Sequence, residues 1–345
     1  MPVHSHAEGL EELVERAEKL PPIRMAVIAA DQALVLQSVV QARKAGLIVP
    51  LLIGAPDEIV ACAGEIDADI TGVEIITAKD AEEAARVGVD LVRGGRADAL
   101  MKGRIHTDAL MRAVLDSDRG LRLPDQRVSH VFVVDIPTYP KLLAITDAAI
   151  NISPDLNAKA QILQNAISLF HLLGVARPKV AALSAVETVN PAIVSTVDAA
   201  CLALMARRGQ ISGAAIDGPM AFDNAISSDA AKVKGIVSEV AGDVDILLVP
   251  DLISGNILAK NLEYLAGATA AGIVLGLSAP VVLSSRADPT QARLAAMALA
   301  VLMHQSSAAQ RRQGREEELE SAIHCAAQPE SACCPIEQNE EWPGV

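Results

Sequence analysis

An α/β fold with two doubly wound domains is predicted for this chain by three features of its sequence. Short apolar runs of strand length alternate with longer segments of helical periodicity from residue 24 onward. Most of these runs are continuously apolar, which is typical of strands buried on both faces of a parallel sheet. The chain is 51% hydrophobic but only 2% aromatic, as expected for a sheet covered by helices rich in Ala, Val and Leu.

The first half of the chain contains six predicted strands. An amphipathic helix is expected over residues 1–20, before the first strand. A further helix is expected over residues 32–45, where Gly46 ends the segment. Two more are expected, one that follows the third strand and runs through Arg93, and one after residue 107. The strands span residues 24–30, 48–53, 73–77, 97–101, 128–134 and 142–145.

The alternation restarts at residues 151–155, which indicates a second α/β domain. Its expected helices span residues 158–173, 191–207 and 228–234, and its strands 179–183, 211–216, 246–249 and 280–283. A terminal helix over 289–304 has an apolar face made by Leu294, Met297, Ala298, Val301 and Leu302. The predicted domains are residues 1–150 plus 288–305, residues 151–287, and an acidic tail, 306–345, that is expected to be disordered.

Charge and cysteine content limit the classes of function. A net charge of −14 over 345 residues argues against general binding of nucleic acid or of anionic membranes, because both ligands are negatively charged. No apolar run is long enough to span a bilayer and no signal peptide precedes Arg24, so a cytoplasmic location is expected. The five cysteines lack the spacing of zinc ligands, and no metal site is predicted.

The strongest candidate site lies near the end of the stretch from Asp245 to Gln291. There an apolar run ends at Ser284, Ser285 and Arg286, directly before the terminal helix. A hydroxyl and a guanidinium at a strand end, beside a helix N-terminus, suit an anion of the phosphate type. A polar strand-end cap with a surface arginine explains the same residues without a ligand.

Two further groups are candidate site residues, and each has a structural alternative. Asp288 precedes Pro289, with Gln291 three positions on, which fits a helix capping box as well as a catalytic base. A polar segment at another strand-to-helix junction offers cationic and hydroxyl donors for a phosphate or for the pyrophosphate of CoA, and a solvated basic loop is its alternative. This segment is Lys102, Gly103, Arg104, Ile105, His106 and Thr107.

Other polar loops indicate less about chemistry. Asp223 and Asn224 could contact a ligand or cap the next helix, and the segment Glu187 to Pro191 most simply begins a helix. No Gly-Lys-Ser/Thr follows Gly255, so a P-loop is absent, and the first strand lacks the glycines of a dinucleotide fingerprint. Nucleotide hydrolysis and ordinary Rossmann redox chemistry are therefore not favoured.

Several segments together resemble the phosphate acetyl/butyryltransferase family. They follow the family's order between about residues 24 and 304, and two of them, SAVETVNP and DGPMAFDNAIS, are most similar to the butyryltransferase branch and to the acetyltransferase modules of bifunctional enoyl-CoA hydratases. The segments are MKGRIHT (101–107), TDAAIN (146–151), SAVETVNP (184–191), DGPMAFDNAIS (217–227), PDLISGNILAK (250–260) and SSRAD (284–288).

The resemblance implies reversible transfer of a short acyl group, acetyl first and butyryl second, between acyl-CoA and inorganic phosphate. It implies two α/β domains of the isocitrate/isopropylmalate dehydrogenase-like type with a cleft between them, a homodimer, and no metal or cofactor. The substrate-binding residues expected within the matching motifs are Lys102, Gly103, Arg104, Thr107, Asp147, Asn151, Asp223, Asn224, Gly255 and Asn256.

The catalytic residues implied by the resemblance centre on Ser285 and Arg286, which match the family's substrate-binding serine and arginine. In the acetyltransferases an aspartate seven residues after that serine takes the proton of the CoA thiol, but Ala292 occupies this position here. Asp288 and His106 are therefore the expected proton acceptors, in a direct transfer within a ternary complex.

Two readings from other classes compete with the acyltransferase. The replacement of the base by Ala292 motivates a non-catalytic protein that binds acyl-CoA or acyl phosphate. A metal-dependent dehydrogenase of related fold is the second, and it would need a carboxylate cluster for a divalent cation. No convincing cluster of that kind is found in the sequence.

Overall fold

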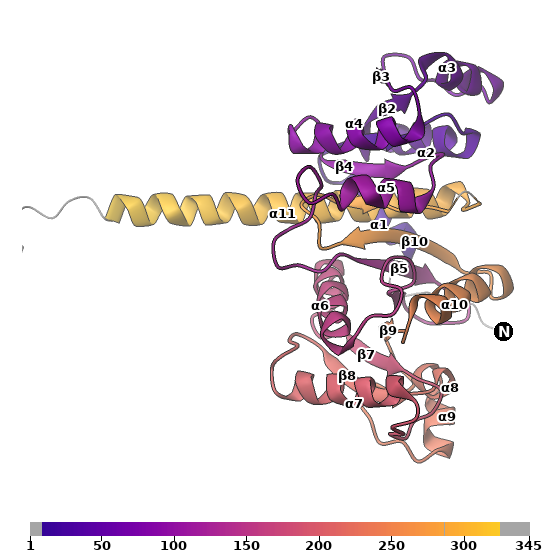
Figure 1. Cartoon of the computed structure of the whole chain (residues 1–345), viewed down its shortest axis with the longest axis vertical. Coiled ribbons are helices and arrows are strands. Elements are labelled where there is room, and N and C mark those ends of the chain that lie inside the picture. The colour runs from indigo at the N-terminus through magenta and orange to yellow at the C-terminus, as the bar shows by residue number, and fades with distance from the viewer. Residues whose placement is uncertain (1–8, 286, 325–345) are drawn as a thin grey trace, which may run out of the picture. The chain divides into compact units, whose positions relative to one another are not determined.

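Within the described residues, 9–285 and 287–324, the computed structural model contains one mixed sheet of eleven strands. The strands are β1 (Ile23–Ile28), β2 (Ile48–Gly54), β3 (Glu74–Thr77), β4 (Ala99–Lys102), β5 (Ser129–Asp135), β6 (Leu143–Thr146), β7 (Lys179–Leu183), β8 (Ala215–Met220), β9 (Ile246–Leu248), β10 (Thr269–Leu275) and β11 (Val281–Val282). Their order is β3-β2-β1-β4-β11-β10-β5-β6-β9-β7-β8, and the strands labelled in Figure 1 follow it from top to bottom.

The helices connect these strands and cover both faces of the sheet. They are α1 (Leu10–Glu18), α2 (Ala33–Lys44), α3 (Pro56–Glu65), α4 (Ala81–Arg93), α5 (Thr107–Val114), α6 (Leu156–Leu173), α7 (Val194–Arg207), α8 (Phe222–Ile226), α9 (Ser228–Val233), α10 (Leu252–Leu265) and α11 (Thr290–His324).

The sheet consists of two parallel groups joined by antiparallel strands. Strands β3, β2, β1, β4 and β11 are parallel neighbours, and so are β6, β9, β7 and β8. The connection runs through β10 and β5, whose pairings with each other, with β11 and with β6 are antiparallel. The predicted α/β class is confirmed, and the sheet is mixed where a largely parallel one was expected.

Local sequence explains where the observed elements differ from the expected ones. The sequence analysis missed β10, whose first half, Thr-Ala-Ala-Gly, has a single β-branched residue and no aromatic residue to mark a strand. It also missed α3 and α8, and it began β8 too early. Gly209 and Gly213 both have positive φ, which keeps the chain in turns until Ala215.

The C-terminal helix α11 runs to His324, well beyond the expected end at residue 304. The chain divides into two compact units, the first ending at Gln305. The predicted boundary between two α/β domains within the first unit stays a prediction, and so does the disorder of the tail, of which residues 325–345 lie outside the described residues.

The hydrophobic core is organised differently on the two faces of the sheet. On one face a single cluster joins α1, α2, α6, α7 and the first turns of α11 to the strands. On the other face there are two clusters, one under α4 and α5 and the other under α8 and α10. This interruption of the apolar core leaves a place on the second face where polar side chains are gathered.

A close backbone approach at Gly103 holds the end of β4 against the end of β1. Gly103 N and Arg104 N donate to Ile28 O and Ala29 O at 2.9 and 2.8 Å. A Cβ on Gly103 would lie 2.3 Å from Ile28 O and 2.4 Å from Ala29 O, both of them backbone atoms. Only glycine fits there without moving the two strand ends apart.

Gly103→Ala should therefore destabilise the protein by about 1–3 kcal/mol, the usual range for forced overpacking. Gly64→Ala is the matched control, because Gly64 lies in α3 and a methyl group added there would meet nothing within 4 Å. In a helix that change should stabilise by about 0.5–1 kcal/mol. Urea unfolding measures both, and equal midpoints for the two variants would contradict the close approach.

Candidate active site

A cavity of about 330 Å³ on the interrupted face combines two of the predicted polar segments. Residues of both apolar clusters of that face line the cavity, for example Leu283 and Phe132. Its walls come from the β4–α5 junction, β5, α10 and the segment after β11. The lining residues are Lys102, Ile105, His106, Thr107, His130, Phe132, Ala149, Asn256, Lys260, Leu283, Ser284 and Ser285.

Parallel pairing of β4 with β11 brings together two segments that are separated by more than half of the sequence. Val281 and Val282 are in register with Leu100 and Met101, so the chain leaves both strands at the same edge. The buried Lys102 donates from Nζ to Ser284 O at 3.4 Å, and Ser284 Oγ donates to Lys102 O at 3.4 Å. Lys102 and Ser285 therefore line one cavity, as the candidate site requires.

The start of α5 opens on the same cavity. His106 is the N-cap residue of α5, has an exposed side chain, and makes no capping hydrogen bond. Thr107 is the first residue of the helix and is half-buried. A helix N-terminus that is not capped by its own side chain favours an anion, because its backbone N–H groups carry partial positive charge.

Sequence analysis missed Arg293, which holds the segment after β11 in place. Its side chain is only 1% exposed. The guanidinium donates to Asp288 O at 3.2 Å, Ser284 Oγ at 3.1 Å and Ser285 O at 2.8 Å. Burial lowers the pKa of Arg293 below its ordinary value, and the charge of Asp288 acts in the opposite direction. An arginine one helical turn before Met297, on the apolar face of the helix, was the available signal.

The side chain of Asp288 points back toward the residues that precede it in the sequence. Its Oδ2 accepts a hydrogen bond from Ser285 N at 2.7 Å, and its Oδ1 lies 3.9 Å from Lys260 Nζ. Burial raises the pKa of this carboxyl, whereas the hydrogen bond from Ser285 N and the charge of Lys260 lower it. Asp288 lines a neighbouring cavity of about 170 Å³ together with Ala292, and it is not among the residues that line the first cavity.

Arg104 is engaged by acidic side chains outside the cavity lining. It pairs with Asp31, and its Nη2 lies 3.2 Å from Glu58 Oε2. The hydrogen bond to Asp31 raises the pKa of Arg104. Two carboxylates already compete for this guanidinium, so its predicted contact with substrate would require their rearrangement.

Asp147 and Asn151 form a buried network within their own motif. The carboxylate of Asp147 accepts hydrogen bonds from Ala149 N, Ile150 N and Asn151 N at 3.0, 3.0 and 3.3 Å. Asn151 Nδ2 donates to Asp147 Oδ2 at 2.6 Å and to Val128 O at 2.9 Å. These bonds fix the loop after β6, and the role of the two residues in binding substrate stays a prediction.

The predicted residues of α10 have two distinct positions. Gly255 is buried, and a Cβ on it would lie 2.6 Å from Val249 Cγ2 and 3.1 Å from Ala148 Cβ, so it lets α10 pack closely. Asn256 is exposed, lines the cavity, and donates to Ala148 O at 3.4 Å. One turn later, Lys260 brings a second cation to the lining, a residue that sequence analysis did not single out.

Asp223 and Asn224 belong to another polar cluster, after β7 and β8. Lys234 Nζ lies 3.0 Å from an Asp223 carboxylate oxygen and 3.4 Å from Glu187 Oε2. The hydrogen bond from Lys234 lowers the pKa of Asp223. Asn224 is buried, and its Nδ2 donates to Glu187 Oε2 at 3.5 Å. Neither residue lines the cavity with Ser285, and their substrate contacts stay a prediction.

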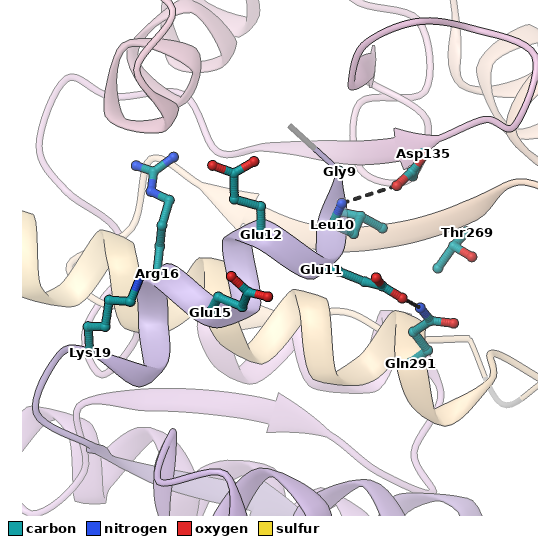
Figure 2. Close-up of a pocket in the computed structure, with 10 residues that line it drawn as sticks. All are labelled: Gly9, Leu10, Glu11, Glu12, Glu15, Arg16, Lys19, Asp135, Thr269 and Gln291. Carbon is teal, nitrogen blue, oxygen red and sulfur yellow. Dashed lines mark hydrogen bonds between the residues drawn. The ribbon is translucent and has the colours of Figure 1, made fainter. Parts of the chain in front are cut away.

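A larger cavity, of about 440 Å³, has the wrong charge for a phosphate. Figure 2 shows Glu11, Glu12, Glu15 and Asp135 around it, with Asp135 Oδ2 accepting from Leu10 N at 3.1 Å. Four carboxylates against Arg16 and Lys19 disfavour an anion. The smaller cavity has two lysines in its lining and joins residues of two predicted motifs, and it is the candidate active site.

Comparison with known proteins identifies the family of this chain. The family model described as phosphate acetyl/butaryl transferase matches residues 80–301. The chain belongs to the phosphate acetyl/butyryltransferase family. The matched range contains all the segments whose resemblance was noted in the sequence.

Individual members of the family are similar over most of their length. A phosphate acetyltransferase of Rhizobium meliloti is 52% identical over 76% of this chain and 83% of its own. A phosphate butyryltransferase of Clostridium acetobutylicum is 40% identical over 86% of this chain and 98% of its own. A solved branched-chain phosphotransacylase from Enterococcus faecalis is 30% identical with a TM-score of 0.72, covering 82% of this chain and 99% of the other.

Membership of the phosphate acetyl/butyryltransferase family makes the protein an acyltransferase. Neither the dehydrogenase nor the non-catalytic binding protein is favoured by these relatives. In the described part of the chain, no three His, Cys, Asp or Glu side chains are grouped to hold a metal ion. None of the described helices is long and apolar enough to cross a membrane.

Arg286, which the family resemblance pairs with Ser285, lies outside the described residues. Ser285 is half-buried at the cavity, and Asp288 is buried behind it. The role of Arg286 in this acyltransferase stays a prediction.

Replacing Arg293 by leucine should destabilise this acyltransferase by at least about 3 kcal/mol, because buried acceptors and the Asp288 charge lose their partner. Activity should fall further than the loss of folded protein explains, since Ser284 and Ser285 lose their support. Arg112→Leu is the control, because Arg112 is 70% exposed and, among the described residues, forms its ion pair with Asp108 one turn earlier in α5. That change should alter stability by less than about 0.5 kcal/mol. Chemical unfolding and specific activity test both, and equal effects would refute the role of Arg293.

Proposed function

We propose that this protein transfers a short acyl group reversibly between CoA and inorganic phosphate, by direct transfer in a ternary complex. The observation that carries the proposal is the cavity in which Lys102, Lys260 and Ser285 meet the start of α5, in a chain of the phosphate acetyl/butyryltransferase family. Two ammonium groups, a hydroxyl and a helix N-terminus suit the phosphate and the developing charge of the reaction.

The reaction balances without any further reactant. In one direction the CoA sulfur attacks the carbonyl carbon of acyl phosphate, a C–S bond forms, and the C–O bond to phosphate breaks. Phosphate leaves with the electron pair, and the thiol proton ends on the phosphate. Because both substrates are held together in the cavity, positioning alone can supply a large part of the rate.

The individual roles follow from position. Ser285 lines the cavity and can donate from its hydroxyl to the carbonyl or thiol region, and Arg286 is proposed to bind phosphate through two parallel hydrogen bonds. His106 lines the cavity and is the better placed of the two expected proton acceptors. Asp288 accepts from Ser285 N and lines the neighbouring cavity, so we propose that it positions Ser285.

Acetyl is the first acyl group that we propose, and butyryl the second. The relatives support both, because the 52% identical protein is named an acetyltransferase and a 40% identical protein a butyryltransferase. We further propose that no metal or prosthetic group takes part, and that the protein acts in the cytoplasm. Within the described residues Cys62 and Cys201 are free thiols, as is usual for that compartment.

A thiol-release assay with DTNB tests the proposed function. Acetyl-CoA, propionyl-CoA and butyryl-CoA should each be offered with and without phosphate, and thiol release should depend on phosphate and survive EDTA. Arg286→Ala should raise the KM for phosphate and reduce kcat at least tenfold, because a bidentate anion contact is lost. Arg112→Ala, at an exposed pair on α5, should leave both constants unchanged.

Four results would count against this proposal. Thiol release that ignores phosphate would indicate a thioesterase, and tight CoA binding without release would indicate a binding protein. A kinetically competent acyl-enzyme would exclude direct transfer. Loss of activity with EDTA would revive metal-dependent chemistry.

A homodimer is the proposed assembly, and an apolar stripe on α10 supports it. Ile253, Ile257 and Tyr264 recur at helical spacing and are 65%, 57% and 71% exposed. Exposed apolar side chains gathered on one face of a helix are typical of an interface. Ile257→Glu should therefore convert the dimer to a monomer in light scattering, whereas Val233→Glu, 89% exposed on α9, should not. A wild-type monomer at all concentrations would refute the assembly.

A further inference from the structure

One side chain in the cavity wall has no explanation in the roles described so far. His130, in β5, is 0% exposed and lines the cavity. Within the described residues neither Nδ1 nor Nε2 of His130 has a hydrogen-bond partner. Its ring meets that of Phe132 edge to face, with centroids 4.4 Å apart and an interplanar angle of 74°.

An imidazole in this state is unusual for a protein interior. Buried polar atoms are nearly always paired, because an unmade hydrogen bond destabilises the native state. Burial lowers the pKa of His130 to about 4, with the charge of Asp147 acting in the opposite direction. At neutral pH the ring is therefore uncharged, with one N–H donor and one acceptor nitrogen.

The surrounding chain is built to hold this ring in the wall. The carboxylate of Asp147 accepts from His130 N at 3.2 Å, and Thr146 Oγ1 donates to His130 O at 2.9 Å. On the neighbouring strand, a Cβ on Gly272 would lie 3.0 Å from His130 Nε2 and 2.4 Å from Leu283 O. A backbone fixed on one side and a glycine on the other leave the ring a defined space.

The other polar groups of the cavity indicate which part of the substrate the ring of His130 contacts. Lys102 and Lys260 supply positive charge, and Ser284 and Ser285 supply hydroxyls. The acyl group must lie between the phosphate and the CoA sulfur, and its carbonyl oxygen becomes negative when the sulfur attacks. A neutral N–H donor in an apolar wall stabilises such an oxygen strongly, since water does not compete for it.

We propose that His130 is a catalytic residue whose neutral ring donates an N–H hydrogen bond to the acyl carbonyl oxygen in the cavity. This inference rests on the proposed function, and it assigns a donor rather than a base. As the C–S bond forms, the carbonyl π electrons move onto the oxygen, and the bond from His130 strengthens. They return when the C–O bond to phosphate breaks, and His130 keeps its proton throughout.

A neutral imidazole suits this role better than that of a base. A base works best when its pKa is close to the working pH, and burial moves His130 away from that range. A hydrogen-bond donor has no such requirement, and an imidazole of lowered pKa can polarise a carbonyl while it stays neutral.

His130→Phe tests the assignment, because it keeps a buried aromatic ring and removes both nitrogens. We expect kcat to fall about 100-fold, the scale for losing one donor to an oxyanion. The KM values for acetyl-CoA and phosphate should stay within about threefold, since the bond forms mainly in the transition state. The melting temperature should not fall, because two unpaired polar atoms are removed.

Two further variants keep the test decisive. His130→Gln retains an N–H donor and should recover at least about fivefold of the kcat lost in His130→Phe. His171→Gln removes an exposed histidine that contacts Gly213 O, outside the cavity lining, and should leave kcat unchanged. If His130→Phe does not fold, the comparison of His130→Gln with wild type and with His130→Leu carries the test.

The pH dependence of kcat/KM separates a donor from a base. Asp147 acts on the charge of the ring, and the charged or titratable groups that line the cavity with it are Lys102, Lys260 and His106. A hydrogen-bond donor that keeps its proton adds no limb to the pH profile of kcat/KM. The acid limb of that profile should therefore lie at the same pH in the wild type and in His130→Gln. If the acid limb of the profile disappears in His130→Gln, the assignment of His130 as a donor is wrong.

The failure of this inference is distinguishable from that of the proposed function. An active wild-type enzyme with an equally active His130→Phe variant would remove His130 from the chemistry and leave the function standing. A wild-type protein without phosphate-dependent thiol release would refute the function itself. If the melting temperature and the kcat of His130→Phe fall in proportion, His130 has a structural role instead.

Discussion

The candidate site depends on one buried cation, Arg293. A charged group is unfavourable in a protein interior unless its donors are paired, and this guanidinium is paired with three acceptors of the segment from Ser284 to Asp288. These bonds determine the path of the chain after β11. As a result Ser285 lines the cavity, while the Asp288 carboxylate turns back to accept from Ser285 N. The arginine acts at the site without lining it.

The sheet order supplies the rest of the geometry. Strand β11 lies between β4 and β10, so a segment near residue 284 meets one near residue 102. The antiparallel pairing of β10 with β5 then carries His130 to the same face as Lys102. The break between the two apolar clusters of this face falls along these strands, with Val274 of β10 in one cluster and Ala270 of β10 in the other. The cavity is thus a consequence of the topology as well as of its polar residues.

The sequence predicted those parts of the site that have local signals. Polar residues directly after apolar runs identified Ser285 and the segment from Lys102 to Thr107, and the family resemblance connected them. Asp147 was predicted in a ligand role, but its motif gives no sign that backbone N–H groups of its own loop bind the carboxylate. Arg293 and His130 were missed because each lies in an apolar pattern, where periodicity assigns a position to the core. Their partners come from strand register and helix packing, which no single segment encodes.

The alanine at position 292 is consistent with this arrangement of charges. Ala292 is buried and lines the same small cavity as Asp288. A carboxylate there would face a second carboxylate in a poorly solvated space, and the pKa of one of them would rise further. In this chain the thiol proton must end on phosphate in any case, so a fixed base near residue 292 is not required by the proton balance. What the transfer does require is that the carbonyl be polarised and that both substrates be held in line. The two lysines, the segment supported by Arg293 and the neutral imidazole of His130 are placed to meet those two requirements.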